Sequence, residues 1–238
     1  MKQVLAIVAL AALAGCSKPA PNGAEQKAEV TSAAATAAPA PLPDVPAGAY
    51  KLDPAHASLI FKVNHVGASN YTARFRKFDA QLQFDPQRPE ASSVSATIDV
   101  ASLETDYPEP EKLDFNKVIS GKDWLGAPSF PQMTFRSTRV EVTGPRTARI
   151  TGDLSLKGIT HPVVLDATFN GGYPAGGMDP SGARIGFSAQ GSLKRSDFGI
   201  KAGIPAPGST MGVGDAVQVI IEAEFTQPAA AAPAAPKS

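Results

Sequence analysis

Residues 78–84 read Phe78-Asp79-Ala80-Gln81-Leu82-Gln83-Phe84, an unbroken alternation of apolar and polar side chains. Successive side chains of a β-strand point to opposite faces, so the pattern predicts a strand with one apolar face and one polar face. The same alternation returns in seven further segments: 59–63, 94–100, 133–135, 148–156, 161–169, 185–193 and 217–225. The chain is therefore predicted to be all-β, with about eight strands.

The connections between these segments are mostly short and carry residues that favour turns. Examples are Asp85-Pro86, Gly144-Pro145 and Gly171-Gly172. Antiparallel strands with short connections and one solvent-exposed face form either a sandwich or a closed barrel. One insertion, from about residue 109 to 124, breaks the rhythm, and within it Leu113, Lys117 and Val118 have helical spacing. We expect an eight-stranded antiparallel barrel with one short helical insertion.

The interior of such a barrel can be filled by its own side chains or can hold one small ligand. Several residues at the predicted inward positions are small: Ala80, Ala96, Gly152, Ala167, Ala189, Gly191 and Ala223. They leave room for an apolar cavity, although alternating small and large residues also fit the taper of a filled barrel. The expected cavity wall consists of larger inward residues: Phe61, Phe78, Leu82, Ile98, Phe135, Leu154, Leu165, Phe187, Val219 and Ile221.

The N-terminus has the layout of a secretory signal. Lys2 supplies a positive charge, residues 4–13 are apolar, and small residues follow. Leu13-Ala14-Gly15-Cys16 resembles the bacterial lipobox, which implies that residues 1–15 are a lipoprotein signal peptide and that Cys16 is acylated. An ordinary signal peptide is the alternative. Ser17 follows the cysteine where an inner-membrane retention signal often has aspartate, so we expect an anchor at the periplasmic face of the envelope, with the outer membrane favoured.

The two ends of the mature chain have a composition that cannot build a core. Residues 16–47 are rich in alanine and proline and contain almost no large apolar residues, and residues 228–238 are similar. We expect a lipidated, disordered spacer over 16–47 and a disordered tail over 228–238. The domain between them covers residues 48–227.

Charge and motifs exclude several classes of function. Lysine plus arginine equals aspartate plus glutamate, at 22 each, and no basic run occurs, so a nucleic-acid partner is not expected. The chain has no Gly-x-Ser-x-Gly elbow, His-Glu-x-x-His pair, Cys-x-x-Cys pair or phosphate-binding loop. We therefore expect a protein that is not an enzyme and that has no cofactor.

The histidines are His56, His65 and His161. Together with Asp53 they could form a metal site, but His56 and His65 have opposite parity, so no metal is expected. We expect His56, His65 and Arg195 as polar groups at a cavity mouth, where they would orient the polar end of a ligand. For Arg195 the competing interpretation is a turn in which it pairs with a carboxylate while Asp197 caps backbone amides.

An ordered set of motifs resembles the YceI-like family of periplasmic, lipocalin-like barrels. The set comprises Asp53-Pro54-Ala55-His56, His65-Val66-Gly67, Phe84-Asp85-Pro86, Thr151-Gly152-Asp153-Leu154, Arg195-Ser196-Asp197-Phe198-Gly199 and Val213-Gly214-Asp215. Many members carry a histidine in the segment that corresponds to residues 107–116, and this chain has none there. In this respect it is similar to the subgroup that occurs beside, or fused to, cytochrome b561 membrane domains.

The resemblance implies binding, storage or transport of a long-chain isoprenoid, either a polyprenyl lipid or a quinone. The alternative is a ligand-free interaction module for a cytochrome b561-like membrane protein or an envelope-stress partner. A filled interior and an exposed apolar patch on the insertion would favour that alternative. Expected partners are therefore the isoprenoid, the membrane through Cys16, the cytochrome and a second copy of the chain.

Overall fold

The computed structural model describes residues 44–176, 179–180 and 182–229. The strands are β1 (Gly48–His65), β2 (Ser69–Phe75), β3 (Phe78–Phe84), β4 (Ser93–Asp99), β5 (Leu103–Glu104), β6 (Gln132–Gly144), β7 (Thr147–Leu156), β8 (Ile159–Tyr173), β9 (Gly182–Lys194) and β10 (Val213–Pro228). The helices are α1 (Phe115–Ser120) and three 3₁₀ turns, η1 (Pro89–Ala91), η2 (Val100–Ser102) and η3 (Arg195–Phe198).

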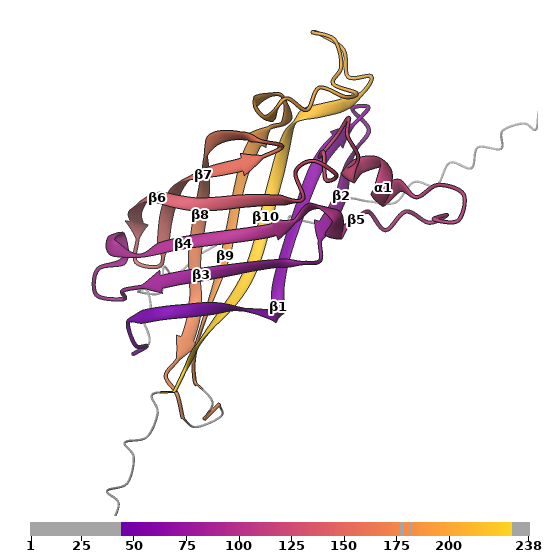
Figure 1. The fold of residues 1–238 in the computed structure, drawn as a ribbon. Helices are drawn as coiled ribbons and strands as arrows, with labels where there is room; N and C mark the ends of the chain where they lie inside the picture. The colour runs from indigo at the N-terminus through magenta and orange to yellow at the C-terminus, as the bar shows by residue number, and fades with distance from the viewer. Residues whose placement is uncertain (1–43, 177–178, 181, 230–238) are drawn as a thin grey trace, which may run out of the picture. The chain divides into compact units, whose positions relative to one another are not determined.

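The strands form one antiparallel sheet that closes on itself. Its order is β10-β9-β8-β7-β6-β4-β3-β1-β2-β5, and β10 also pairs with β1. The second half of β1 pairs with β2 and its first half with β3, so β2 and β3 occupy one position in the ring. In the same way β5 pairs with β2 where β4 pairs with β3. The predicted eight-stranded barrel is therefore confirmed (Figure 1).

The first strand bends sharply about half-way along its length (Figure 1). Leu52 pairs with Phe225 and Ala57 pairs with Ala223, so residues 53–56 of β1 face Glu224 alone. Such a bulge bends a strand and increases its twist. The bend lets β1 leave β3 and continue beside β2 while it stays paired with β10 throughout.

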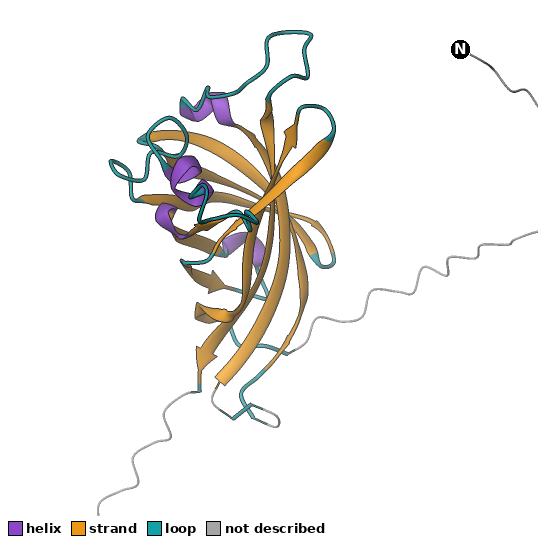
Figure 2. Ribbon diagram, turned by 90° about the vertical axis from the view of Figure 1, so that its right-hand side faces the viewer, coloured by secondary structure: helices purple, strands orange, loops and turns teal. Residues whose placement is uncertain are grey.

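Side-chain parity follows the predicted alternation. In β3, Ala80 and Leu82 are buried, whereas Asp79, Gln81 and Gln83 are exposed. The buried residues form two clusters. One, at the end where β3 and β10 finish, includes Tyr50, Phe169, Ile185 and Phe225, and we call this the far end. The other includes Phe75, Met133, Phe198 and Ile200. Ile119 of α1 packs against it, and we call this end the lid end. The helices are short beside the strands of the barrel (Figure 2).

The domain extends slightly beyond the predicted bounds. Val45 is 5% exposed and belongs to the far-end cluster, and the hydroxyl of Tyr50 donates to the carbonyl of Pro46 at 2.7 Å. The expectation of a disordered spacer is therefore wrong for residues 45–47, which are held against the barrel by Val45 and by hydrogen bonds to the carbonyls of Pro46 and Ala47. Pro228, expected in the tail, still pairs with Gly182.

The rest of the expected spacer, the signal peptide, Cys16 and residues 230–238 lie outside the described residues. Within the described part of the chain, no helix combines the length and apolar character needed to cross a bilayer.

The predicted helical insertion is present, as α1. Asp114 caps its start by accepting a hydrogen bond from the amide of Lys117 at 2.9 Å, and the helix ends before Gly121. The helix is shorter than the insertion: turns make up the remainder of residues 105–131. We call this segment, between β5 and β6, the lid. It lies beside β2 and β5 (Figure 1).

Candidate functional site

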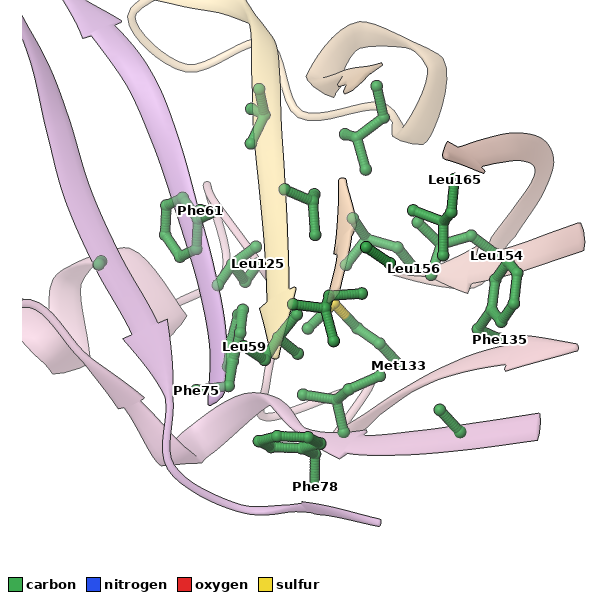
Figure 3. Close-up of a pocket in the computed structure, with 18 of the residues that line it drawn as sticks. Leu59, Phe61, Phe75, Phe78, Leu125, Met133, Phe135, Leu154, Leu156 and Leu165 are labelled. Carbon is green, nitrogen blue, oxygen red and sulfur yellow. The ribbon is translucent and has the colours of Figure 1, made fainter. Parts of the chain in front are cut away.

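The barrel encloses a cavity of about 550 Å³, within the range of small-molecule binding sites. Side chains from strands all around the ring, and from the lid, point into it (Figure 3). All the residues that the sequence predicted for the wall line it: Phe61, Phe78, Leu82, Ile98, Phe135, Leu154, Leu165, Phe187, Val219 and Ile221. The interior is therefore not filled by the protein's own side chains.

The small inward residues fall into two groups. The alanines all line the cavity: Ala80, Ala96, Ala167, Ala189 and Ala223. The glycines instead make room for neighbouring side chains. A Cβ on Gly152 would lie 2.3 Å from the Phe135 ring, and one on Gly191 would lie 2.8 Å from the Leu165 side chain. The alanines therefore contribute the empty volume, while the two glycines allow close packing between strands.

Aromatic rings close the far end. Phe84 stacks on Phe169 with ring centroids 5.9 Å apart, and Phe187 lies 5.3 Å from Phe169 and 6.2 Å from Phe225. Leu52 and Phe225 line the cavity beside them. This end of the cavity is consequently apolar.

The lid covers the opposite end of the cavity. Its inward side chains are Tyr107, Phe115, Ile119, Trp124 and Leu125, of which Figure 3 labels Leu125 among the residues that line the pocket. Trp124, the sole tryptophan of the sequence, directly follows the predicted helix, and this position is one signal for a cap over the barrel. The spacing of Phe115 and Ile119 on one face of a helix is a signal that could have indicated the others.

Polar contacts fasten the lid to the barrel. The side-chain oxygen of Asn116 accepts hydrogen bonds from the amide and the hydroxyl of Thr105, at 2.8 and 2.5 Å. Its amide group donates to Glu104 at 3.2 Å. At the start of the lid, Arg74 donates to both carboxylate oxygens of Asp106 at 2.8 Å, and Asp106 has a left-handed φ of 51°. The lid is therefore held at a polar hinge.

The polarity of the cavity wall is uneven. Lining residues with a side-chain nitrogen or oxygen are His65, Tyr71, Thr105, Tyr107, Trp124 and Arg195. All of them belong to the lid or to the strand ends beside it. Tyr71 donates to the carbonyl of Thr105 at 3.0 Å, so its hydroxyl is already hydrogen-bonded. The residues with polar side-chain atoms that border the cavity are therefore confined to the lid end, and the wall elsewhere is apolar.

Arg195 is the charged residue on this wall, and it is 7% exposed. It donates to the backbone carbonyls of Gly214, Ala202 and Val213 at 2.9, 2.9 and 2.7 Å. The Trp124 ring lies over the guanidinium, with its centroid 5.3 Å away. Burial lowers the pKa of Arg195, since a charged group loses hydration there.

The turn that we expected around Arg195 is present, but its contacts differ. Arg195 bonds backbone carbonyls and not a carboxylate. Asp215, and not Asp197, accepts from the amide and hydroxyl of Ser196, at 2.8 and 2.7 Å. The predicted contact with the cavity is consistent with this placement, because Arg195 faces both the turn and the cavity.

A family model described as the YceI-like domain matches residues 50–225, which covers the whole barrel and lid. The chain belongs to the YceI-like family. Two of its relatives are UPF0312 proteins of Pseudomonas. That of P. savastanoi pv. phaseolicola is 42% identical over 155 residues, 65% of this chain and 75% of the relative. That of P. putida W619 is 40% identical over 167 residues, 69% and 80% of the two chains.

Solved structures share the fold. BcnA of Burkholderia cenocepacia is 28% identical with a TM-score of 0.60, covering 73% of this chain and 98% of that one. The Campylobacter jejuni YceI protein is 29% identical with a TM-score of 0.58, covering 69% and 90%. A domain of Saccharophagus degradans described as polyisoprenoid-binding is 14% identical with a TM-score of 0.54, covering 75% and 98%.

The histidines of this YceI-like domain do not share one place. His65 lines the cavity and is solvent-exposed at the lid end, as expected for a mouth residue. The expectation for His56 is wrong: it lies in the bulge of β1, exposed on the outer surface, and its Nδ1 is 2.8 Å from the Asp53 carboxylate. The bulge places four successive residues against one partner, so simple alternation does not predict where His56 points.

Around that bulge, Asp53, His56 and Glu224 bring potential metal ligands within 4.8 Å of one another. Arg184 lies between the carboxylates, 2.6 Å from Asp53 and 2.7 Å from Glu224. Its hydrogen bond, with that of His56, holds the pKa of Asp53 at about 2. A guanidinium thus neutralises the carboxylates, and the arrangement is an ion-pair network that braces the bulge.

Proposed function

We propose that the cavity binds one long-chain isoprenoid lipid, a polyprenyl lipid or an isoprenoid quinone, and that the protein stores or carries it unchanged. The observation that supports this most is the extent of the apolar wall. Six residues of β10, spread from its start to near its end, contribute inward side chains to the same cavity: Val213, Val217, Val219, Ile221, Ala223 and Phe225. The cavity therefore follows most of the barrel.

Its length favours a long chain over an ordinary acyl chain. The segment from Val213 to Phe225 measures about 40 Å at roughly 3.3 Å per residue. A strand tilt of roughly 40° makes that about 30 Å along the barrel axis. The two leaflets of a bilayer core together span about 30 Å, so one acyl chain reaches about 15 Å. A longer isoprenoid chain would use the whole cavity.

The chemistry of the wall supports the same ligand class. Burying hydrocarbon is favourable by about 0.8 kcal/mol per CH₂, before the cost of ordering the chain is subtracted. A charged group placed deep in the cavity would lose its hydration without a partner, because the wall there is apolar. Binding without a covalent step is sufficient for storage or transport. The Saccharophagus degradans domain with this fold, described as polyisoprenoid-binding, agrees with this ligand class.

The ligand-free interaction module is less well supported. It required a filled interior, and the barrel is hollow. The lid does expose Leu113 and Val118, at 42% and 41%, so one of its two requirements is met. These side chains leave room for a membrane or protein contact in addition to lipid binding.

We further propose that Cys16 anchors the chain in the envelope, with the outer membrane favoured. The support is the sequence pattern before Cys16. The test is metabolic labelling with a palmitate analogue and membrane fractionation. We expect the wild-type protein to be labelled and to appear in the outer-membrane fraction. The Cys16→Ser variant should be unlabelled and released from the membrane. An unlabelled wild-type protein would remove the anchor.

The binding proposal is tested with the full chain after denaturation, solvent extraction and refolding. Polyprenols of increasing length, ubiquinone and palmitate are added, and bound lipid is measured by native mass spectrometry. We expect saturable one-to-one binding that tightens with isoprenoid chain length and exceeds that of palmitate. Lack of saturable isoprenoid binding by correctly refolded protein would overturn the proposal.

A further inference from the structure

We infer that the ligand is bound in one direction, with a hydrogen-bond-accepting headgroup against Arg195 and Trp124 beneath the lid and its tail toward Phe225. This inference rests on the proposed function and deepens it, because it assigns a headgroup site and a headgroup class. The class is an oxygen acceptor: a phosphate oxygen or a quinone carbonyl.

The first argument is the distribution of polar atoms. Side chains with nitrogen or oxygen line the cavity only at the lid end, while the far end is closed by phenylalanine rings and Leu52. Transfer of a polar headgroup into an apolar site without a hydrogen bond costs several kcal/mol. A headgroup at the far end would incur that cost, whereas a hydrocarbon terminus would not.

The second argument is the state of Arg195. Its guanidinium is more than nine-tenths buried, and it bonds neutral carbonyls in place of a carboxylate. A guanidinium has more N–H groups than these three carbonyls accept. The buried positive charge and its remaining donors favour an oxygen acceptor, and they disfavour a cationic headgroup.

The third argument is that the hydroxyls of two neighbouring residues are occupied. Thr105 donates to Asn116 and Tyr71 donates to Thr105. Of the other polar lining residues, Arg195 is the one that carries a permanent positive charge, so its N–H groups are the strongest donors for an acceptor at this end. Trp124 covers one face of the guanidinium and shields it from water, which strengthens a hydrogen bond made there.

The orientation is tested by fluorescence, because Trp124 is the sole tryptophan in the sequence. A quinone ring quenches tryptophan emission at close range, whereas a polyprenol has no such ring. The delipidated full chain is titrated with long-tailed ubiquinone and with a polyprenol of matched tail length, and binding is measured separately by native mass spectrometry. We expect bound ubiquinone, but not bound polyprenol, to remove more than half of the emission.

The headgroup class is tested by comparing polyprenyl phosphate with the matched polyprenol. If polyprenyl phosphate binds at least tenfold more tightly than polyprenol, the headgroup is anionic. If ubiquinone quenches Trp124 but polyprenyl phosphate binds no more tightly than polyprenol, the headgroup is a neutral carbonyl. Arg195→Met should remove either preference while polyprenol binding persists. The wild-type comparisons remain decisive even if this variant does not fold.

Opposite results separate the two proposals. Suppose that isoprenoids bind, but that ubiquinone does not quench Trp124 and that polyprenyl phosphate and polyprenol bind with equal affinity. This result would overturn the headgroup site and leave the proposed function intact. If no isoprenoid binds, the proposed function itself fails.

Discussion

Asp53 shows how one carboxylate stabilises a bend in the barrel wall. It lies in the bulge of β1, is 17% exposed, and accepts a hydrogen bond from Arg184 at 2.6 Å. Arg184 also bonds Glu224 on β10, so the same guanidinium joins both strands. The favourable contacts hold the pKa of Asp53 at about 2, below its ordinary value of 3.8. Since the folded protein prefers the ionised form, this pair stabilises the fold only while Asp53 is charged.

Replacing Asp53 should therefore change how stability depends on pH. We expect Asp53→Asn to lower the free energy of unfolding by about 1 to 2 kcal/mol at pH 6. The stabilisation is complete above the unfolded pKa near 3.8 and is lost as pH falls toward 2, so the two proteins should converge over that range. Urea denaturation at several pH values measures this. Asp153→Asn, at an exposed position, is the control, and a constant difference between wild type and Asp53→Asn down to pH 2 would contradict the assignment.

Ala189 illustrates how a single small side chain keeps the cavity open. It lies on β9 opposite Ile221 and faces the interior, whereas its neighbour Gln190 is exposed. We expect Ala189→Phe to fill cavity volume and to weaken isoprenoid binding at least tenfold, with little loss of stability because the space is empty. Gln190→Phe adds the same ring outside the barrel and should leave binding unchanged. Equal affinity of the two variants would show that this part of the cavity does not hold the ligand.

At the scale of elements, the lid covers one end of the cavity, and we propose that it moves when a lipid enters. Its inner side chains over the cavity are mostly apolar, and its attachment to β5 is polar. Polar attachments can open in water at lower cost than a packed core, because water replaces the lost hydrogen bonds. The lid is therefore the entrance that we propose for the barrel.

Removing the Asn116 side chain should loosen the lid. Asn116→Ala loses the contacts with Thr105 and Glu104, which we expect to cost about 1 to 3 kcal/mol of lid closure. Bound isoprenoid should dissociate about tenfold faster, and acrylamide should quench Trp124 more strongly. Transfer of lipid to vesicles and fluorescence measure the two effects. Lys122→Ala, an exposed position of the same lid, should change neither, and unaltered dissociation in Asn116→Ala would argue for entry elsewhere.

At the scale of the whole molecule, the barrel has a packed cluster at each end and a hollow between them. A protein interior is normally close-packed, and side chains that border an empty space lose contacts. A ligand that occupies the cavity therefore restores the missing packing contacts and should stabilise the folded barrel.

Ligand removal should consequently lower thermal stability. Free ligand at about 100 times its Kd adds about 2.7 kcal/mol to the stability of a folded protein. For a domain of this size that is a difference of about 5 to 10 °C in Tm. Scanning calorimetry of the full chain, delipidated and then reloaded with polyprenol, measures the difference. An identical Tm in both states would mean that the lipid does not bind the folded barrel.

Much of the fold could be predicted because alternation specifies a strand and the face that it buries. Each predicted wall residue, from Phe61 on β1 to Ile221 on β10, lines the cavity. The pattern was weaker where strands are irregular. The first part of β1 was missed, since Pro54 and the bulge interrupt the alternation there. The strand β2 was also missed, although Tyr71, Ala73 and Phe75 alternate with polar residues. The lid residues were missed because turns have no period.

Local order of apolar and polar residues, read along this chain, was enough to establish an all-β domain, the inward face of its strands and the small residues that leave space between them. Other features depend on contacts between distant positions. Arg184 meets Asp53 across 131 residues, Arg195 turns from the expected carboxylate to three carbonyls, and the lid folds over the cavity. Periodicity reports which face of a strand avoids water, but the partner of a polar group is chosen only when the barrel closes and brings that partner within hydrogen-bonding distance.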